Sequence, residues 1–184
     1  MADATIFRIS VAFDERTRAS VQSGLDRLAS SSDLDSDEGR AAALRATLDL
    51  LASAGEGATH CHLHREVLDD ARAPEVFDAA AAELRGRYPH ETRRNASTAA
   101  APEVPESDAP GSVVVTLLTG WAARLETPST FAAKGELQGF LSDGVPPVPL
   151  VALEVIWSPS VDRDRMSAEA MAEKYPELAP LSAG

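Results

Sequence analysis

The sequence has only one cysteine, Cys61, and few aromatic side chains. A single cysteine excludes an intrachain disulfide and permits a reducing compartment. Aromatic residues make up 5% of the 184 residues, whereas hydrophobic residues as a whole make up 44%. We therefore expect a packed core that is built mainly from aliphatic side chains.

Basic side chains are also scarce. Lysine and arginine number 17 against 29 aspartates and glutamates, which gives a formal net charge of −12. This excess of negative charge disfavours partners that are themselves anionic, so we expect no nucleic-acid binding and no membrane binding. The simplest role of the charge is to keep a small protein soluble.

Long apolar runs are missing as well. No stretch approaches the roughly 18–20 apolar residues that a membrane-spanning helix needs, and residues 1–6 do not resemble a secretory signal. We therefore expect a soluble, cytoplasmic protein. The sequence also lacks a Gly-x-Ser-x-Gly elbow and a phosphate-binding loop. Whether the protein is an enzyme stays open, although the absence of these catalytic motifs favours a role without catalysis.

Hydrophobic periodicity predicts four strands, at residues 6–13, 58–67, 113–118 and 150–157. Helices are predicted after Asp14, from Ser36, over 74–88, near 129–141 and after Ser167. The order β-α-α-β-α-β-α-β-α indicates an α/β or α+β fold with about four strands in a mixed sheet and about five helices.

The last two predicted strands are apolar on both faces, which indicates central positions in the sheet. The histidine-rich strand at residues 58–67 is expected at an edge. Residues 95–111 are rich in alanine, proline and acids and are predicted to form a mobile linker. The chain as a whole, 1–184, is expected to form one globular domain.

Three motifs carry a resemblance to a known family: Val-Val-Val-Thr-Leu-Leu at 113–118, Ala-Leu-Glu-Val-Ile-Trp-Ser-Pro at 152–159, and the segment Met166–Leu178. Together they resemble the domain of unknown function 1517 family of cyanobacterial, plastid and other bacterial proteins. The order of elements before residue 40 is also compatible. The resemblance implies a common fold, and it supplies neither catalytic residues nor a cofactor.

Three of the four histidines lie in His60-Cys61-His62-Leu63-His64. On a strand, His60, His62 and His64 project from one face and Cys61 and Leu63 from the other. Two histidines two residues apart can share a metal ion such as zinc. No second histidine cluster completes such a site, so the simpler interpretation is an exposed strand face.

Glu154 stands alone among apolar residues in the strand 150–157. A buried carboxylate needs a partner, and Arg8 in the first strand is the candidate. The pair could form a structural ion pair, which we favour, or line the binding site of a small ligand. A separate basic island, Arg85, Arg87, Arg93 and Arg94, could hold a phosphate or an acidic partner, or complement the end of a helix.

The leading hypothesis is a soluble module that binds a protein partner or itself without catalysis. Trp121 and Trp157 lie at strand ends, where large aromatic side chains can anchor an interface. The first alternative is a metal-binding protein or metal-dependent enzyme that uses the histidine strand. The second is a small-ligand-binding domain with Glu154 and Arg8 in the site.

Overall fold

The computed structural model describes residues 3–87, 111–160 and 165–183. The strands are β1 (Asp3–Phe13), β2 (Ala58–Asp69), β3 (Val113–Trp121), β4 (Leu150–Ser158) and β5 (Ala179–Pro180). The α-helices are α1 (Glu15–Ser31), α2 (Asp37–Ser53), α3 (Ala73–Gly86), α4 (Lys134–Asp143) and α5 (Ala168–Lys174), and short 3₁₀ turns η1 (Gly55–Gly57) and η2 (Asp70–Arg72) flank β2.

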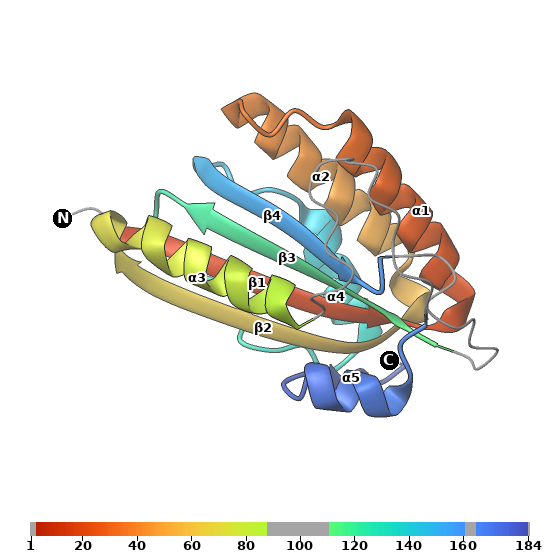
Figure 1. Ribbon diagram of the computed structural model, residues 1–184. Coiled ribbons are helices and arrows are strands. Elements are labelled where there is room, and N and C mark those ends of the chain that lie inside the picture. The colour runs from red at the N-terminus through yellow and green to blue at the C-terminus, as the bar shows by residue number, and fades with distance from the viewer. Residues whose placement is uncertain (1–2, 88–110, 161–164, 184) are drawn as a thin grey trace.

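The strands form one sheet in the order β4-β3-β1-β2-β5, and each neighbouring pair is antiparallel (Figure 1). The predicted class and the predicted order of elements are confirmed. Two details of the prediction were wrong. The described sheet contains a fifth, two-residue strand at the end of the chain, and it is antiparallel where a mixed sheet was expected. Strand direction depends on how helices cross the sheet, which local periodicity does not specify.

One face of the sheet is covered by α1, α2 and α4, and we call it the α1/α2 face (Figure 1). Alternate residues of the strands point into this layer. The strands contribute apolar side chains such as Ile9, Val115 and Leu117, and the helices contribute Leu25 and Leu51. This layer is the larger of the hydrophobic clusters and forms the main core.

The opposite face, which we call the α3 face, is covered in two parts. Helix α3 packs over the part of the sheet that contains Ile6 and Leu118. Helix α5 and the residues around it pack over the other part, where Tyr175 and Met166 join Val114. Polar side chains of β1 and β2 therefore lie between α3 and α5.

Helix starts follow the sequence signals. The Asp14 carboxylate accepts a hydrogen bond from the Thr17 backbone N–H at 3.1 Å and begins α1. The Ser36 and Ser167 hydroxyls cap α2 and α5 in the same way, each at 3.1 Å. Each cap satisfies a backbone donor that the helix itself leaves unpaired.

The position of β4 differs from the sequence prediction. Strand β3 is central and buried along its whole length, as expected, but β4 is an edge strand. Apart from Glu154, both of its faces are largely apolar because helices cover them from two sides, although incompletely. The expected linker at 95–111 lies outside the described residues except for Gly111, which is buried.

Candidate functional site

The clearest surface feature of the fold is the open edge of β4. Within the described residues, β4 pairs with β3 and has no strand on its other side. At the opposite edge β5 pairs with β2 at His60 and Cys61, and the rest of β2 after Cys61 has no further strand beside it in the described part of the chain. An open strand edge presents backbone N–H and C=O groups to a further chain.

The usable part of this edge has defined ends. Between Gly120 and Trp121 the register with β3 shifts, so Val151 has no directly opposed residue. Such a bulge interrupts regular pairing. Pro149 and Pro159 flank the strand and lack a backbone N–H. Regular backbone pairing is therefore open only along 152–158.

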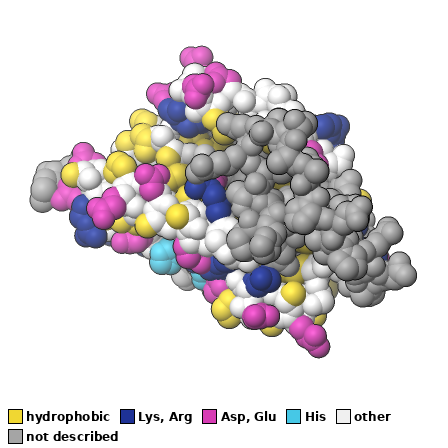
Figure 2. Space-filling model, viewed as in Figure 1, with side chains coloured by type: hydrophobic (Ala, Val, Ile, Leu, Met, Phe, Trp, Pro, Cys, Tyr) yellow, Lys and Arg dark blue, Asp and Glu magenta, His cyan; other side chains and the backbone are white. Residues whose placement is uncertain are grey.

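The two rows of side chains on β4 differ in chemistry. On the α1/α2 face, Leu153, Val155 and Trp157 are half-buried against the main core. Ahead of them, Val151 is 50% exposed. Figure 2 shows hydrophobic side chains gathered around the start of β4. The α1/α2 side of the edge is thus an apolar row that its own helices cover only in part.

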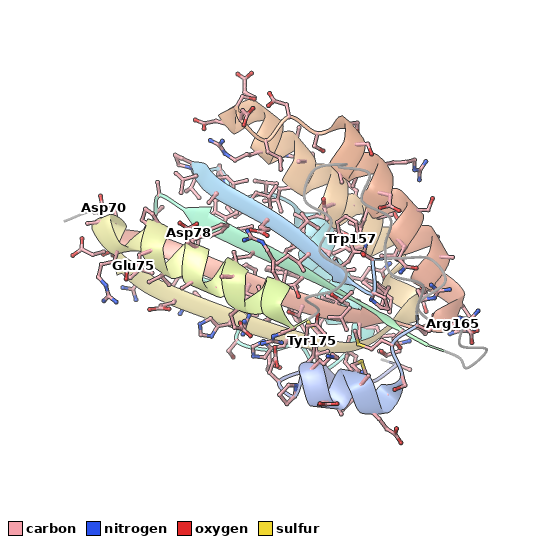
Figure 3. The ribbon with its side chains drawn as sticks, in the orientation of Figure 1. Asp70, Glu75, Asp78, Trp157, Arg165 and Tyr175 are labelled. Carbon is pink, nitrogen blue, oxygen red and sulfur yellow. The ribbon has the colours of Figure 1, made fainter. Side chains whose placement is uncertain are left out.

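The α3 face of β4 carries charge. The Glu154 carboxylate accepts two hydrogen bonds from the Arg85 guanidinium of α3, one of them Nε to Oε1 at 2.5 Å. The hydrogen bond with Glu154 raises the pKa of Arg85, and the nearby charge of Asp78 adds to this effect. Asp78 lies on the side of α3 nearer to β4 (Figure 3). The α3 side of the edge therefore carries one paired acid, Glu154, beside the apolar Ile156, which packs under α3, and Asp78 of α3 adds a second negative charge nearby.

The predicted pairing of Glu154 with Arg8 was wrong. Arg8 instead donates to Glu83 of α3 at 3.2 Å. Arg8 and Glu154 do share the α3 face and the same cross-strand row, but Leu118 of β3 lies between them. Two strand spacings, roughly 9–10 Å between their Cα atoms, separate them, and each side chain pairs with a residue of α3 instead. Glu154 and Arg8 therefore do not form an ion pair with each other, and a ligand site that uses both stays a prediction.

Glu154→Gln is expected to lower the free energy of unfolding by about 1–2 kcal/mol, because it leaves the Arg85 charge without its partner. The Arg85 and Glu154 side chains are 30% and 21% exposed, so solvent limits the loss. Urea denaturation of Glu154→Gln, Arg85→Met and the double variant should show clear coupling. The matched cycle with Arg8→Met should be additive. Coupling to Arg8 with none to Arg85 would contradict the observed pairing.

The histidine strand has the alternation that the sequence predicted. His60, His62 and His64 pair across to Ala12, Ser10 and Arg8 on the α3 face. Cys61 and Leu63 point into the main core. Burial raises the pKa of the Cys61 thiol to about 12, so this cysteine is not a reactive thiolate at neutral pH.

The surroundings of the histidines do not resemble a metal centre. The His60 Nδ1 and the Thr59 hydroxyl share a hydrogen bond of 3.0 Å. Burial lowers the pKa of His60, and burial together with the Arg8 charge lowers that of His62. Across residues 3–87, 111–160 and 165–183, no three or more histidine, cysteine, aspartate or glutamate side chains are grouped so that they could hold a metal ion.

A network of ion pairs fills the space between α3 and α5. Arg87 donates to Glu83 at 2.7 Å and to Glu177 at 2.5 Å, and its guanidinium lies 5.0 Å from the ring centre of Tyr175. Tyr175 lies between the end of α3 and α5 (Figure 3). These contacts fasten the C-terminal segment to α3. Arg85 and Arg87, predicted as one basic island, thus serve two separate ion-pair sites, while Arg93 and Arg94 lie outside the described residues.

The two tryptophans occupy different environments. Trp121 is 3% exposed, and its indole Nε1 donates to the Thr119 hydroxyl at 2.8 Å, so it belongs to the core. Trp157 is half-buried near the end of β4 (Figure 3). Its Nε1 is buried and has no hydrogen-bond partner among the described residues. Of the two, only Trp157 remains available to an interface at the β4 edge.

The fold defines an α+β protein whose antiparallel sheet is covered by helices on both faces and ends in an open, largely apolar edge strand. The chain belongs to the family described as Protein of unknown function (DUF1517), which matches residues 3–181. No curated protein and no solved structure matches the chain. None of the helices in the described part of the chain has the length and apolar character needed to cross a membrane.

Proposed function

We propose that the chain is a protein-binding module that takes up an extended segment of a partner along the edge of β4. The observation that carries this proposal is the outer edge of residues 152–158, which no strand of the described chain covers on the side away from β3. Strand addition at such an edge provides affinity through main-chain hydrogen bonds, and alternate side chains provide specificity.

The helices on both sides support this use of the edge. Helix α2 contacts β4 on one face of the sheet, and α3 contacts it on the other. An added strand would therefore lie beside layers that already exist, and it would cover the half-buried row Leu153, Val155 and Trp157. Covering partly exposed apolar side chains contributes roughly 25 cal/mol per Å² of apolar area.

Trp157 fits the edge of such an interface. Its ring packs on the main core, while its Nε1 donor lacks a partner among the described residues. Large aromatic side chains such as tryptophan are enriched where proteins bind each other. Trp157 therefore stays a candidate interface residue, whereas Trp121 has a structural role.

A display library of random twelve-residue peptides tests the proposal. Peptides selected on the wild-type protein are expected to slow amide hydrogen exchange at 152–158, because a bound strand pairs with the outward amides of β4. Val151→Lys places a charge beside the edge and is expected to weaken these peptides by roughly tenfold or more.

Leu34→Lys is the matched control. Leu34 is 46% exposed, close to the 50% of Val151, but it lies in the turn between α1 and α2. This variant should bind the selected peptides as the wild type does. Peptides that protect a different part of the chain and tolerate Val151→Lys would overturn the β4 edge as the binding site.

A further inference from the structure

We infer that the segment bound at β4 carries aliphatic side chains on one face and a lysine or arginine opposite Glu154 on the other. This inference rests on the proposed function and adds the chemistry of the partner. The open edge itself does not select a sequence, because backbone groups are common to all chains. Selectivity must come from the two rows of β4 side chains that an added strand would meet.

The first row requires apolar partners. Side chains directly opposite one another in an antiparallel pair lie on the same face and contact each other. Residues of an added strand opposite Leu153, Val155 and Trp157 would therefore lie on the α1/α2 face. There they would continue the main core outward, so aliphatic or aromatic side chains fit.

On the second row Glu154 lies between Ala152 and Ile156, and the position opposite Glu154 favours positive charge. Opposite Glu154, an added residue would lie on the α3 face, close to the side of α3 that carries Asp78 (Figure 3). Arg85 donates two hydrogen bonds to the Glu154 carboxylate. A carboxylate offers about four acceptor positions. Capacity for a further donor therefore remains, and the local balance of Glu154, Arg85 and Asp78 is one negative charge.

The whole chain reinforces this local preference. Its net charge of −12 attracts basic segments over longer distances and repels acidic ones, including a second copy of the chain. Self-pairing of two β4 strands with full overlap of 150–158 would also place two Glu154 side chains opposite each other. Like charges directly opposite one another destabilise a strand pair. The edge therefore suits a basic partner better than it suits its own copy.

Three synthetic peptides provide the test. Each alternates valine with a second residue, which is lysine in the first peptide, glutamine in the second and glutamate in the third. Binding is measured by fluorescence anisotropy at low and high salt. The lysine peptide is expected to bind roughly tenfold tighter than the glutamine peptide and to weaken as salt rises, and the glutamate peptide should not bind.

Variants locate the charge effect. Asp78→Asn should weaken the lysine peptide several-fold and leave the glutamine peptide unchanged. Glu173→Gln removes one exposed carboxylate on α5, away from β4, and is the control. It should change binding far less than Asp78→Asn does. An equal loss of affinity for the lysine peptide in both variants would show general attraction by net charge. It would overturn a local charge effect at β4.

The remaining outcomes separate this inference from the proposed function. Equal or tighter binding of the glutamine peptide overturns the basic partner and leaves strand addition standing. If none of the three peptides binds while library peptides still bind at 152–158, the basic partner is again overturned and strand addition stands. Analytical ultracentrifugation of the protein alone covers the last case: a dimer that Val151→Lys abolishes and Leu34→Lys preserves would identify a second copy as the occupant and overturn the basic partner.

Discussion

Replacing Gly57 by alanine is expected to destabilise the protein by about 3 kcal/mol, because the added methyl group has no space. A Cβ atom at Gly57 would lie 2.1 Å from the Thr17 hydroxyl oxygen and 2.7 Å from the Thr17 Cβ. Thr17 cannot easily move away. Its hydroxyl and its backbone N–H both donate to the Asp14 carboxylate, each at 3.1 Å.

The same position also joins two elements of the fold. The Gly57 carbonyl accepts a hydrogen bond from the Asp14 N–H at 2.8 Å, which ties the start of β2 to the start of α1. Any shift that makes space for the methyl group therefore disturbs the cap of α1 as well. Thermal and urea unfolding of Gly57→Ala measure the effect.

Two further variants make this experiment decisive. Gly139→Ala, on the exposed side of α4, has no atom within 4 Å of the new Cβ and should stabilise the protein by roughly 0.5–1 kcal/mol. Combining Gly57→Ala with Thr17→Ala removes the nearest clashing atoms and should recover part of the loss. If Gly57→Ala unfolds as the wild type does, the close approach of α1 to η1 is wrong.

Leu117→Ala is expected to cost about 3–4 kcal/mol, the usual range for removing a fully buried leucine side chain. Leu117 lies in the middle of β3 and is 1% exposed. Its neighbours across the sheet are Ile9 of β1 and Val155 of β4. Since β3 is fixed between these two strands, the backbone cannot collapse to fill the cavity.

Leu34→Ala is the matched control, since it is the same chemical change at a leucine that is 46% exposed. It should alter the free energy of unfolding by less than about 0.5 kcal/mol. Urea titration of both variants, with unchanged slopes, would give the difference directly. A similar small loss in both would mean that the α1/α2 layer is not packed on β3 as the structure describes.

Part of the candidate site was readable from sequence. The alternation of His60 and His62 with Cys61 follows from the two-residue period of any strand, so it was predicted correctly. Glu154 stood out as a lone acid in an apolar strand, and its need for a partner was correctly anticipated.

The partner of Glu154 could not be found in this way. Arg8 lies on the α3 face of the sheet, and Arg85 lies on the helix that packs against that face. Which of them pairs with Glu154 depends on which strand lies beside β4 and on where α3 crosses the sheet. Because β3 lies beside β4, Arg8 is two strands away and pairs with Glu83, while Arg85 of α3 pairs with Glu154.

The local features of this protein follow from its sequence alone. Hydrophobic periodicity and capping residues such as Asp14, Ser36 and Ser167 specify the order of strands and helices, because these signals act within a few residues. The antiparallel pairing, the edge position of β4, the burial of Trp121 and the pairing of Glu154 with Arg85 instead depend on the tertiary structure. Each of these depends on contacts between residues far apart in the chain, which the packing of helices on both faces of the sheet selects.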